Sequence, residues 1–332
     1  MDGRFQTDRQ TDRQTDRQTD RQTDRIIAIP FAYEQNMNSG VNIQSDRALQ
    51  IYLKNICVAC VSAKHYNPEC EVALVTNLNS DEIPENIASI LQDNEIVIIY
   101  APFDRFRFPA DYLWSLAFYK LCALSHLVEQ GFKKMCYLDA DVYIQGSFEA
   151  LWQECDENLL LYDINHGLNT KDYQIICSEF DEFLEDNKTK YITHYGGEFF
   201  AANSEDAKRF LTYTEQVYNT MISRNFKTTK GDEFIVSISA HYMRESVKNA
   251  GAYIFRFWSG IGFRLVSTCY KYNAVTVLHL PAEKESGLLK IYDRFICKGN
   301  VPSNEEVWRI CRLSKVPVID MAKLVVLRIL KR

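Results

Sequence analysis

Apolar segments of strand length alternate with helical segments through the first half of the chain, and this alternation constrains the fold more than any other feature. Strands that are separated by helices at this spacing typically form a parallel sheet with the helices packed on its faces. We therefore expect an α/β fold with a mainly parallel sheet. The expected strands are residues 25–34, 71–77, 95–103 and 133–145, and the expected helices are residues 45–64, with Ser45 as the N-cap, 82–93 and 110–131.

The second half of the chain changes character but contains no linker rich in Pro, Gly or Ser. Strand patterns occur at residues 158–165 and at residues 274–287, and a helix is expected to follow the capping residue Ser204. We expect one domain over residues 26–300, with an elaborated second half, and a helical C-terminal segment over residues 301–332.

The N-terminal region repeats the four residues Thr-Asp-Arg-Gln over residues 7–25. The repeat has no apolar face that could pack against a core, so we interpret residues 1–25 as a disordered tail. The remaining chain is long enough to bury a large core, and 46% of the 332 residues are apolar.

Composition excludes some classes of function. The formal charge of −6 gives no reason to expect nucleic-acid binding. No apolar run reaches the roughly 18–20 residues of a membrane span, and the N-terminus lacks the apolar stretch of a secretory signal. The ten cysteines are scattered, and we expect reduced thiols in a cytoplasmic protein. Cys57 and Cys60 lie in a helical pattern and are interpreted as buried thiols, with metal or redox chemistry as the alternative.

Two acids interrupt an apolar run in the segment Cys-Tyr-Leu-Asp-Ala-Asp-Val-Tyr-Ile, where Asp139 and Asp141 are one residue apart. They fall at the carboxyl end of the fourth expected strand, which is the edge of a parallel sheet where ligands bind. Two carboxylates at one such position are suited to a hard divalent cation such as Mn²⁺ or Mg²⁺, which often shares the phosphates of a substrate.

The segment Lys-Met-Cys-Tyr-Leu-Asp-Ala-Asp-Val-Tyr-Ile-Gln-Gly-Ser-Phe-Glu-Ala-Leu-Trp resembles the core motif of the GT-A glycosyltransferases, especially family 8, which includes glycogenin and bacterial lipopolysaccharide glycosyltransferases. The resemblance covers roughly residues 26–152. It implies a GT-A (Rossmann-like) fold, a Mn²⁺ (or Mg²⁺) ion at Asp139 and Asp141, and a nucleotide-sugar donor. It places Tyr33 at the nucleotide, and Lys120 at the position of a cation that contacts the donor.

The same resemblance makes His279, at the end of a late strand, the candidate third metal ligand. An isolated His at a strand end can also be purely structural. Lys284 follows where the family has a lysine that binds the donor diphosphate, but this chain lacks the Lys-Pro-Trp sequence of the family there.

The resemblance also places Asp232 and Glu233 near the reacting sugar, as catalytic residues, although acids are common at a helix N-terminus for electrostatic reasons alone. The segment His-Tyr-Gly-Gly-Glu-Phe-Phe resembles the acceptor side, which makes His194, Gly197 and Glu198 candidates for acceptor binding; an ordinary tight turn is the alternative. Trp258 could stack on a sugar, or it could be a buried core residue.

The chain ends in Met-Ala-Lys-Leu-Val-Val-Leu-Arg-Ile-Leu-Lys-Arg, which combines apolar residues with four cations. We interpret it as a packed terminal helix with a solvated basic end. The alternative is weak peripheral contact with an anionic membrane surface.

Three functions remain after this reading. The first is a metal-dependent glycosyltransferase that acts with retention on a glycan or glycolipid acceptor, as in polysaccharide biosynthesis. The second is a nucleotidyltransferase that makes a nucleotide sugar; it is disfavoured because the loop after the first strand has one glycine, Gly40, and one arginine, Arg47. The third is a non-catalytic protein of the same fold that binds a nucleotide sugar.

Overall fold

The structure is a computed structural model that describes residues 24–34, 47–165, 171–185, 192–257 and 275–313, and four single residues after position 320. The expected cap Ser45, the aromatic candidate Trp258, most of the N-terminal repeat and the basic cations of the C-terminal segment lie outside the described residues. Among the described residues, no helix is long and apolar enough to cross a membrane.

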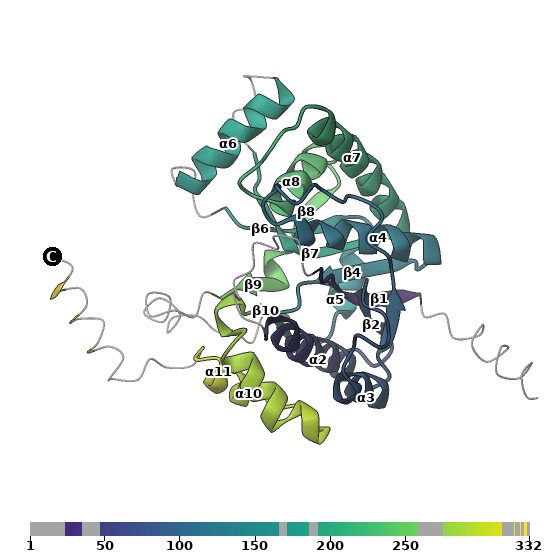
Figure 1. The fold of residues 1–332 in the computed structure, drawn as a ribbon, viewed down its shortest axis with the longest axis vertical. Coiled ribbons are helices and arrows are strands. Elements are labelled where there is room, and N and C mark those ends of the chain that lie inside the picture. The colour runs from purple at the N-terminus through teal and green to yellow at the C-terminus, as the bar shows by residue number, and fades with distance from the viewer. Residues whose placement is uncertain are drawn as a thin grey trace, which may run out of the picture.

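The strands form a main sheet in the order β3-β2-β1-β4-β7-β6-β8 and a small sheet in the order β5-β10-β9 (Figure 1). In the main sheet, β3, β2, β1 and β4 run parallel, β7 is antiparallel to both β4 and β6, and β8 is parallel to β6. The strands of the main sheet are β1 (Arg25–Phe31), β2 (Glu71–Thr76), β3 (Val97–Tyr100), β4 (Lys134–Leu138), β6 (Leu159–Asp163), β7 (Tyr195–Asn203) and β8 (Val247–Asn249). The small sheet contains β5 (Val142–Ile144), β9 (Ile254–Arg256) and β10 (Val277–His279).

Helices cover both faces of the main sheet, as the sequence predicts for a parallel α/β fold (Figure 1). One face is covered by α2 (Ala48–Tyr66), α3 (Glu85–Asp93) and α10 (Gly287–Arg294), and the other by α4 (Tyr119–Gln130), α6 (Lys171–Leu184), α7 (Ser204–Ser223) and α8 (Asp232–Tyr242). Two further α-helices, α5 (Glu149–Glu154) and α11 (Asn304–Ile310), are short.

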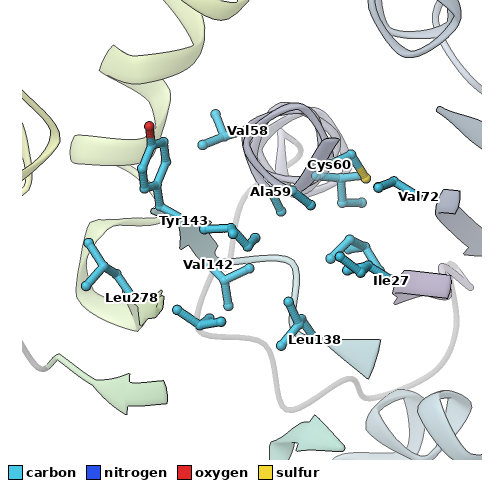
Figure 2. Packing of buried hydrophobic residues seen from close by; sticks show 14 of the residues in the cluster. Ile27, Val58, Ala59, Cys60, Val72, Leu138, Val142, Tyr143 and Leu278 are labelled. Carbon is cyan, nitrogen blue, oxygen red and sulfur yellow. The ribbon is translucent and has the colours of Figure 1, made fainter. Parts of the chain in front are cut away.

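The central strand β1 shows why its sequence is apolar without a polar face. Ile27 and Ile29 belong to the core on the α2 side, whereas Ile26 and Ala28 belong to the core on the α4 side. Since successive side chains of a strand point to opposite faces, a strand that is covered on both sides needs apolar residues throughout. Figure 2 shows Ile27 on the α2 side, near the α2 residue Cys60.

Helix α2 is buried over most of its length, and it carries Cys57 and Cys60 into the core. Burial in apolar surroundings raises the pKa of Cys57 to about 12, so the neutral thiol is the stable form. The interpretation of these two residues as buried helix thiols is therefore confirmed.

Several boundaries differ from the sequence expectation, and three of them have a clear physical reason. Strand β1 begins at Arg25, as the expected strand does, but Arg25 pairs with Lys134, so the sheet includes a residue that the sequence analysis also counted in the tail. The helix expected from residue 110 starts only at Tyr119, after a short 3₁₀ turn, because Trp114 has a φ of 60°, which an α-helix cannot contain. Helix α7 is capped by Asn203, whose side chain accepts a hydrogen bond from Asp206 N, and not by Ser204.

We predict that Ile27→Ala lowers the free energy of unfolding by about 2–5 kcal/mol, because it removes buried methylene groups at the centre of the sheet and leaves a cavity. The matched change Val97→Ala, in the edge strand β3 where the side chain is 41% exposed, should stay within about 0.5 kcal/mol of the wild type. Urea unfolding measures both values, and equal losses would contradict the assignment of β1 to the centre of the core.

Candidate active site

A cavity of 670 Å³ lies where β1 and β4 end. The residues that follow β1, from Ala32 to Glu34, form one wall, and the residues that follow β4, from Asp139 to Asp141, form another. The starts of α4 and α8 and the ends of β9 and β10 close the remaining sides. The cavity thus occupies the edge of a parallel sheet at which ligands bind.

Asp139, Asp141 and His279 converge on this cavity. Asp139 directly follows β4, and Asp141 directly precedes β5. Because β10 pairs antiparallel with β5, His279 lies opposite Val142 and therefore beside Asp141. His279 Nε2 lies 3.4 Å from Asp141 Oδ2 and 3.9 Å from Asp139 Oδ2. Strand pairing, and not sequence proximity, brings the histidine to the two acids.

The three side chains fit a divalent cation. One ligand atom from each lies within 4.8 Å of the others. Neighbouring ligands of an octahedral Mg²⁺ at 2.0–2.1 Å are about 3 Å apart, and opposite ligands about 4 Å apart, so the observed separations suit one ion. Asp141 is 2% exposed, and its buried Oδ2 atom lies 3.4 Å from His279 Nε2 and 3.2 Å from Lys284 Nζ. A buried carboxylate oxygen in this state is suited to a cation.

Two lysines stand beside the acids. Lys284 Nζ lies 3.2 Å from Asp141 Oδ2, and Lys120 Nζ lies 2.9 Å from Asp139 Oδ1. Burial alone would favour the neutral acid at Asp141, but Lys284 and His279 outweigh it and hold the pKa of Asp141 well below its ordinary value. The lysines can therefore compensate negative charge on the acids and on an anion that enters the cavity.

Lys120 also joins the acid pair to the start of α8, since its Nζ atom lies 2.8 Å from Asp232 Oδ2. Burial raises the pKa of Asp232 to about 6, although Lys120 opposes this effect. Asp232 follows Gly231, whose φ of 58° favours glycine. A Cβ atom at Gly231 would lie 2.8 Å from Cβ of Trp114, so the turn that aims Asp232 at the cavity also needs glycine for space.

A second network fills the floor of the cavity around Glu198 and Arg256. The guanidinium donates from Nε to Glu198 Oε1 and from a terminal nitrogen to Glu198 Oε2, at 2.6 Å in each case. The same terminal nitrogen donates to Glu233 Oε1 at 3.0 Å, and Glu233 Oε2 lies 3.0 Å from His194 Nε2. On its other side, Glu198 Oε1 lies 3.2 Å from His279 Nδ1.

The adjacent glycines of β7 make room for both networks. A Cβ atom at Gly196 would lie 1.9 Å from Glu198 Oε2, and a Cβ atom at Gly197 would lie 1.8 Å from Asp232 Oδ2. Real Cβ contacts are never this short, so any other residue at either position would displace a buried carboxylate. The pair Gly196 and Gly197 is therefore required by close approach and not by an ordinary turn.

The structure brings most of the predicted site residues to one place. The cavity is lined by Tyr33, Lys120, Asp139, Asp141, Gly197, Glu198, Asp232, Glu233, His279 and Lys284. His194 is buried behind Glu233 and contacts the cavity through it. Trp258 lies outside the described residues, so its proposed contact with a sugar stays a prediction.

Sequence analysis did not identify several residues of the cavity, among them Arg256, Tyr52 and Trp114. Arg256 lies in the short strand β9, and the signal that could have found it is a lone arginine between apolar neighbours in Ile-Phe-Arg-Phe. Tyr52 and Trp114 also line the cavity, and Lys284 Nζ lies 5.6 Å from the centre of the Tyr52 ring. Aromatic residues in helical or turn patterns give no signal that separates a cavity wall from a core.

Comparisons with known proteins agree with this geometry. The sequence profile described as Glycosyl transferase family 8 matches residues 28–221, more than half of the chain. No curated protein sequence matches the chain. Among solved structures, galactosyltransferase LgtC in complex with donor and acceptor sugar analogs is similar with a TM-score of 0.52 at 14% identity, over 86% of this chain and 99% of that chain.

An active-site mutant of LgtC is similar with a TM-score of 0.53 at 15% identity, over 86% of this chain and 99% of that chain. The apo form of mouse xyloside xylosyltransferase 1 gives a TM-score of 0.48 at 10% identity, over 77% of this chain and 96% of that chain. At such identities the likeness to LgtC shows the fold, which is the expected GT-A fold.

We predict that Gly197→Ala lowers the free energy of unfolding by about 1–3 kcal/mol, because the added methyl group forces Asp232 away from Lys120 and leaves buried charges poorly paired. Gly146→Ala is the matched control, since its Cβ would meet only Thr276 Cγ2 at an ordinary 3.7 Å. Urea unfolding of the two variants should separate them clearly; equal stability would contradict the close approach at Gly197.

The raised pKa of Asp232 predicts a pH dependence of stability. The folded state holds the proton of Asp232 up to about pH 6, whereas the ordinary pKa of the group is 3.8. The stability that this proton contributes is complete below about pH 4 and is lost as the pH rises through about 6. The wild type should therefore lose about 2–3 kcal/mol relative to Asp232→Asn across this interval. Urea unfolding of both proteins at pH 4–8 measures the difference, and a constant difference would contradict the prediction.

Proposed function

The chain belongs to glycosyl transferase family 8, and from that premise we propose that it transfers a sugar from a nucleotide-diphosphate sugar, first of all a UDP-sugar, to a hydroxyl group of a glycan or glycolipid. The observation that carries the proposal is the convergence of Asp139, Asp141 and His279 on one cavity, with Lys120 and Lys284 beside them. These are the groups that a metal-bound diphosphate needs.

In this proposal Asp139, Asp141 and His279 would hold Mn²⁺ or Mg²⁺. When bound, such a cation supplies Lewis-acid stabilisation of the negative charge on the departing diphosphate. Lys284 and Lys120 add positive charge on the two sides of the acid pair, where that diphosphate charge would develop. Tyr33, which lies in the cavity wall formed after β1, would contact the nucleotide.

The reacting sugar would lie toward the start of α8. Burial alone would favour the neutral acid at Glu233, but His194 and Arg256 outweigh it and lower the pKa of Glu233, so the residue carries a negative charge at neutral pH. A carboxylate there stabilises the positive charge that develops on the sugar carbon as its bond to the diphosphate breaks. The acceptor hydroxyl oxygen then bonds to that carbon, and its proton passes to the departing diphosphate. The family resemblance makes retention of configuration the expected outcome. His194 and Gly197 belong to the acceptor side in this scheme.

A cytoplasmic location, a role in polysaccharide biosynthesis and a weak membrane contact through the basic C-terminal segment stay predictions from the sequence. Two alternative functions are also kept, and the test below distinguishes the second of them from a glycosyltransferase. A nucleotidyltransferase would release pyrophosphate from a nucleoside triphosphate and a sugar phosphate. A non-catalytic protein would bind the donor without turning it over.

We predict that a UDP-sugar raises the unfolding temperature of the wild type in the presence of Mn²⁺ but not with a chelator. A donor at about 100 times its Kd adds about 2.7 kcal/mol, which corresponds to a shift of several degrees. The panel contains UDP-glucose, UDP-galactose, both UDP-N-acetylhexosamines and GDP-mannose. The double variant Asp139→Asn/Asp141→Asn should lose the shift, because it removes two of the three proposed ligands.

Release of UDP from the donor that binds then measures turnover, and Asp139→Asn should reduce kcat by about 10²–10³-fold. Asp206→Asn is the matched control, since Asp206 is a buried acid that lies at the opposite end of the sheet, beside Asn203 and the start of β4. Normal turnover by Asp139→Asn would contradict the mechanism, and a shift without turnover would favour the non-catalytic function.

A further inference from the structure

We propose that Glu198 is a positioning residue that orients the imidazole of His279 toward the cation, and that Arg256 holds Glu198 in place for this task. The inference rests on the proposed function, because it assigns residues around the same site. It replaces the expectation that Glu198 contacts the acceptor with a role inside the protein.

Both carboxylate oxygens of Glu198 already have partners inside the protein. The residue is 1% exposed, although it lies directly beneath the cavity. Oε2 accepts a hydrogen bond from Arg256, and Oε1 accepts one from Arg256 Nε and lies 3.2 Å from His279 Nδ1. A guanidinium that donates to both oxygens of a buried carboxylate is its charge partner. Glu198 is thus a charged group whose partners are an arginine and a histidine.

The two ring nitrogens of His279 lie near different acids. Its Nδ1 atom faces Glu198, and its Nε2 atom faces Asp139 and Asp141. A carboxylate at Nδ1 keeps a proton on that nitrogen, which fixes the ring orientation and leaves the Nε2 lone pair for a cation. The negative charge of the carboxylate also makes Nε2 a stronger ligand.

Arg256 donates hydrogen bonds to both carboxylate oxygens of Glu198. In this bidentate geometry a guanidinium fixes both the position and the orientation of a carboxylate. Asp139 N also donates to the backbone oxygen of Glu198 at 3.0 Å, so the strand that carries Glu198 is joined directly to a proposed metal ligand. Since Arg256 reaches Glu233 as well, one rigid group aligns the metal side of the cavity with the side of the reacting sugar.

Gly196 offers a way to move this arrangement without removing a charge. Its Cβ would lie 1.9 Å from Glu198 Oε2 and 2.8 Å from a terminal nitrogen of Arg256. Gly196→Ala must therefore displace the carboxylate, the guanidinium or both. Glu198→Gln, in contrast, keeps the shape of the side chain and removes its charge.

The test measures Mn²⁺ affinity directly, by following the electron paramagnetic resonance signal of free Mn²⁺ in a titration of the full chain. Glu198→Gln and Gly196→Ala should each raise the Kd for Mn²⁺ by about 10–100-fold, the usual effect of losing the partner of a ligating histidine. The matched controls Asp206→Asn and Gly146→Ala should bind Mn²⁺ as the wild type does, because neither residue touches the site. Thermal unfolding shows that each variant is folded.

The outcomes distinguish a failure of the positioning role of Glu198 from a failure of the proposed metal-dependent function. If the wild type binds Mn²⁺ and both Glu198→Gln and Gly196→Ala bind it equally tightly, Glu198 and Arg256 form only a structural ion pair and the positioning role is wrong, while the proposed function stands. If the wild type does not bind Mn²⁺ at all, the metal-dependent function fails and the positioning role fails with it. A variant that does not fold leaves the decision to the other variant, since the two act on the same carboxylate by different means.

Discussion

The site depends on one constraint: several carboxylates are buried or half-buried around a single cavity, and each needs a positive partner. Taking an ionised acid out of water costs several kcal/mol unless a cation or hydrogen-bond donors replace the water. Lys120, Lys284 and Arg256 supply those partners from helix α4, the turn before α10 and strand β9. The acids concerned are Asp139, Asp141, Glu198, Asp232 and Glu233.

These pairings connect the proposed metal side of the cavity with the proposed sugar side. His279 joins them at one point, because it faces the two aspartates with one nitrogen and Glu198 with the other. Lys120 joins them at a second point, between Asp139 and Asp232. This arrangement has a steric consequence. The backbone of β7 lies so close to the carboxylates of Glu198 and Asp232 that a side chain at Gly196 or Gly197 would displace them. In the proposed reaction, charged groups that are already held in position by their partners favour the transition state, because they need no rearrangement as charge develops on the substrate.

Much of the fold could be predicted because β1, β2 and β4 carry continuous apolar runs, and the helices between them have apolar faces. The same logic located Asp139 and Asp141, since the carboxyl ends of parallel strands meet at one edge. Predicted helix boundaries were wrong where the backbone of a single residue decided them. The left-handed backbone of Trp114 means that α4 starts later than predicted, and the hydrophobic periodicity of the sequence gives no signal of this. Arg256 was missed because its partners, Glu198 and Glu233, are far from it in the sequence.

The sequence by itself determined the mainly parallel α/β class, the edge of the sheet that carries the site, and the pair of acids at that edge, because each of these follows from local patterns of burial and strand order. Only the tertiary structure decided which side chains pair with one another at the site. His279 reaches Asp141 through the antiparallel pairing of β10 with β5, and the carboxylate of Glu198 is paired with Arg256 and His279. Such contacts join residues that are tens of positions apart, and they are set by the register of strands, which a sequence pattern does not specify.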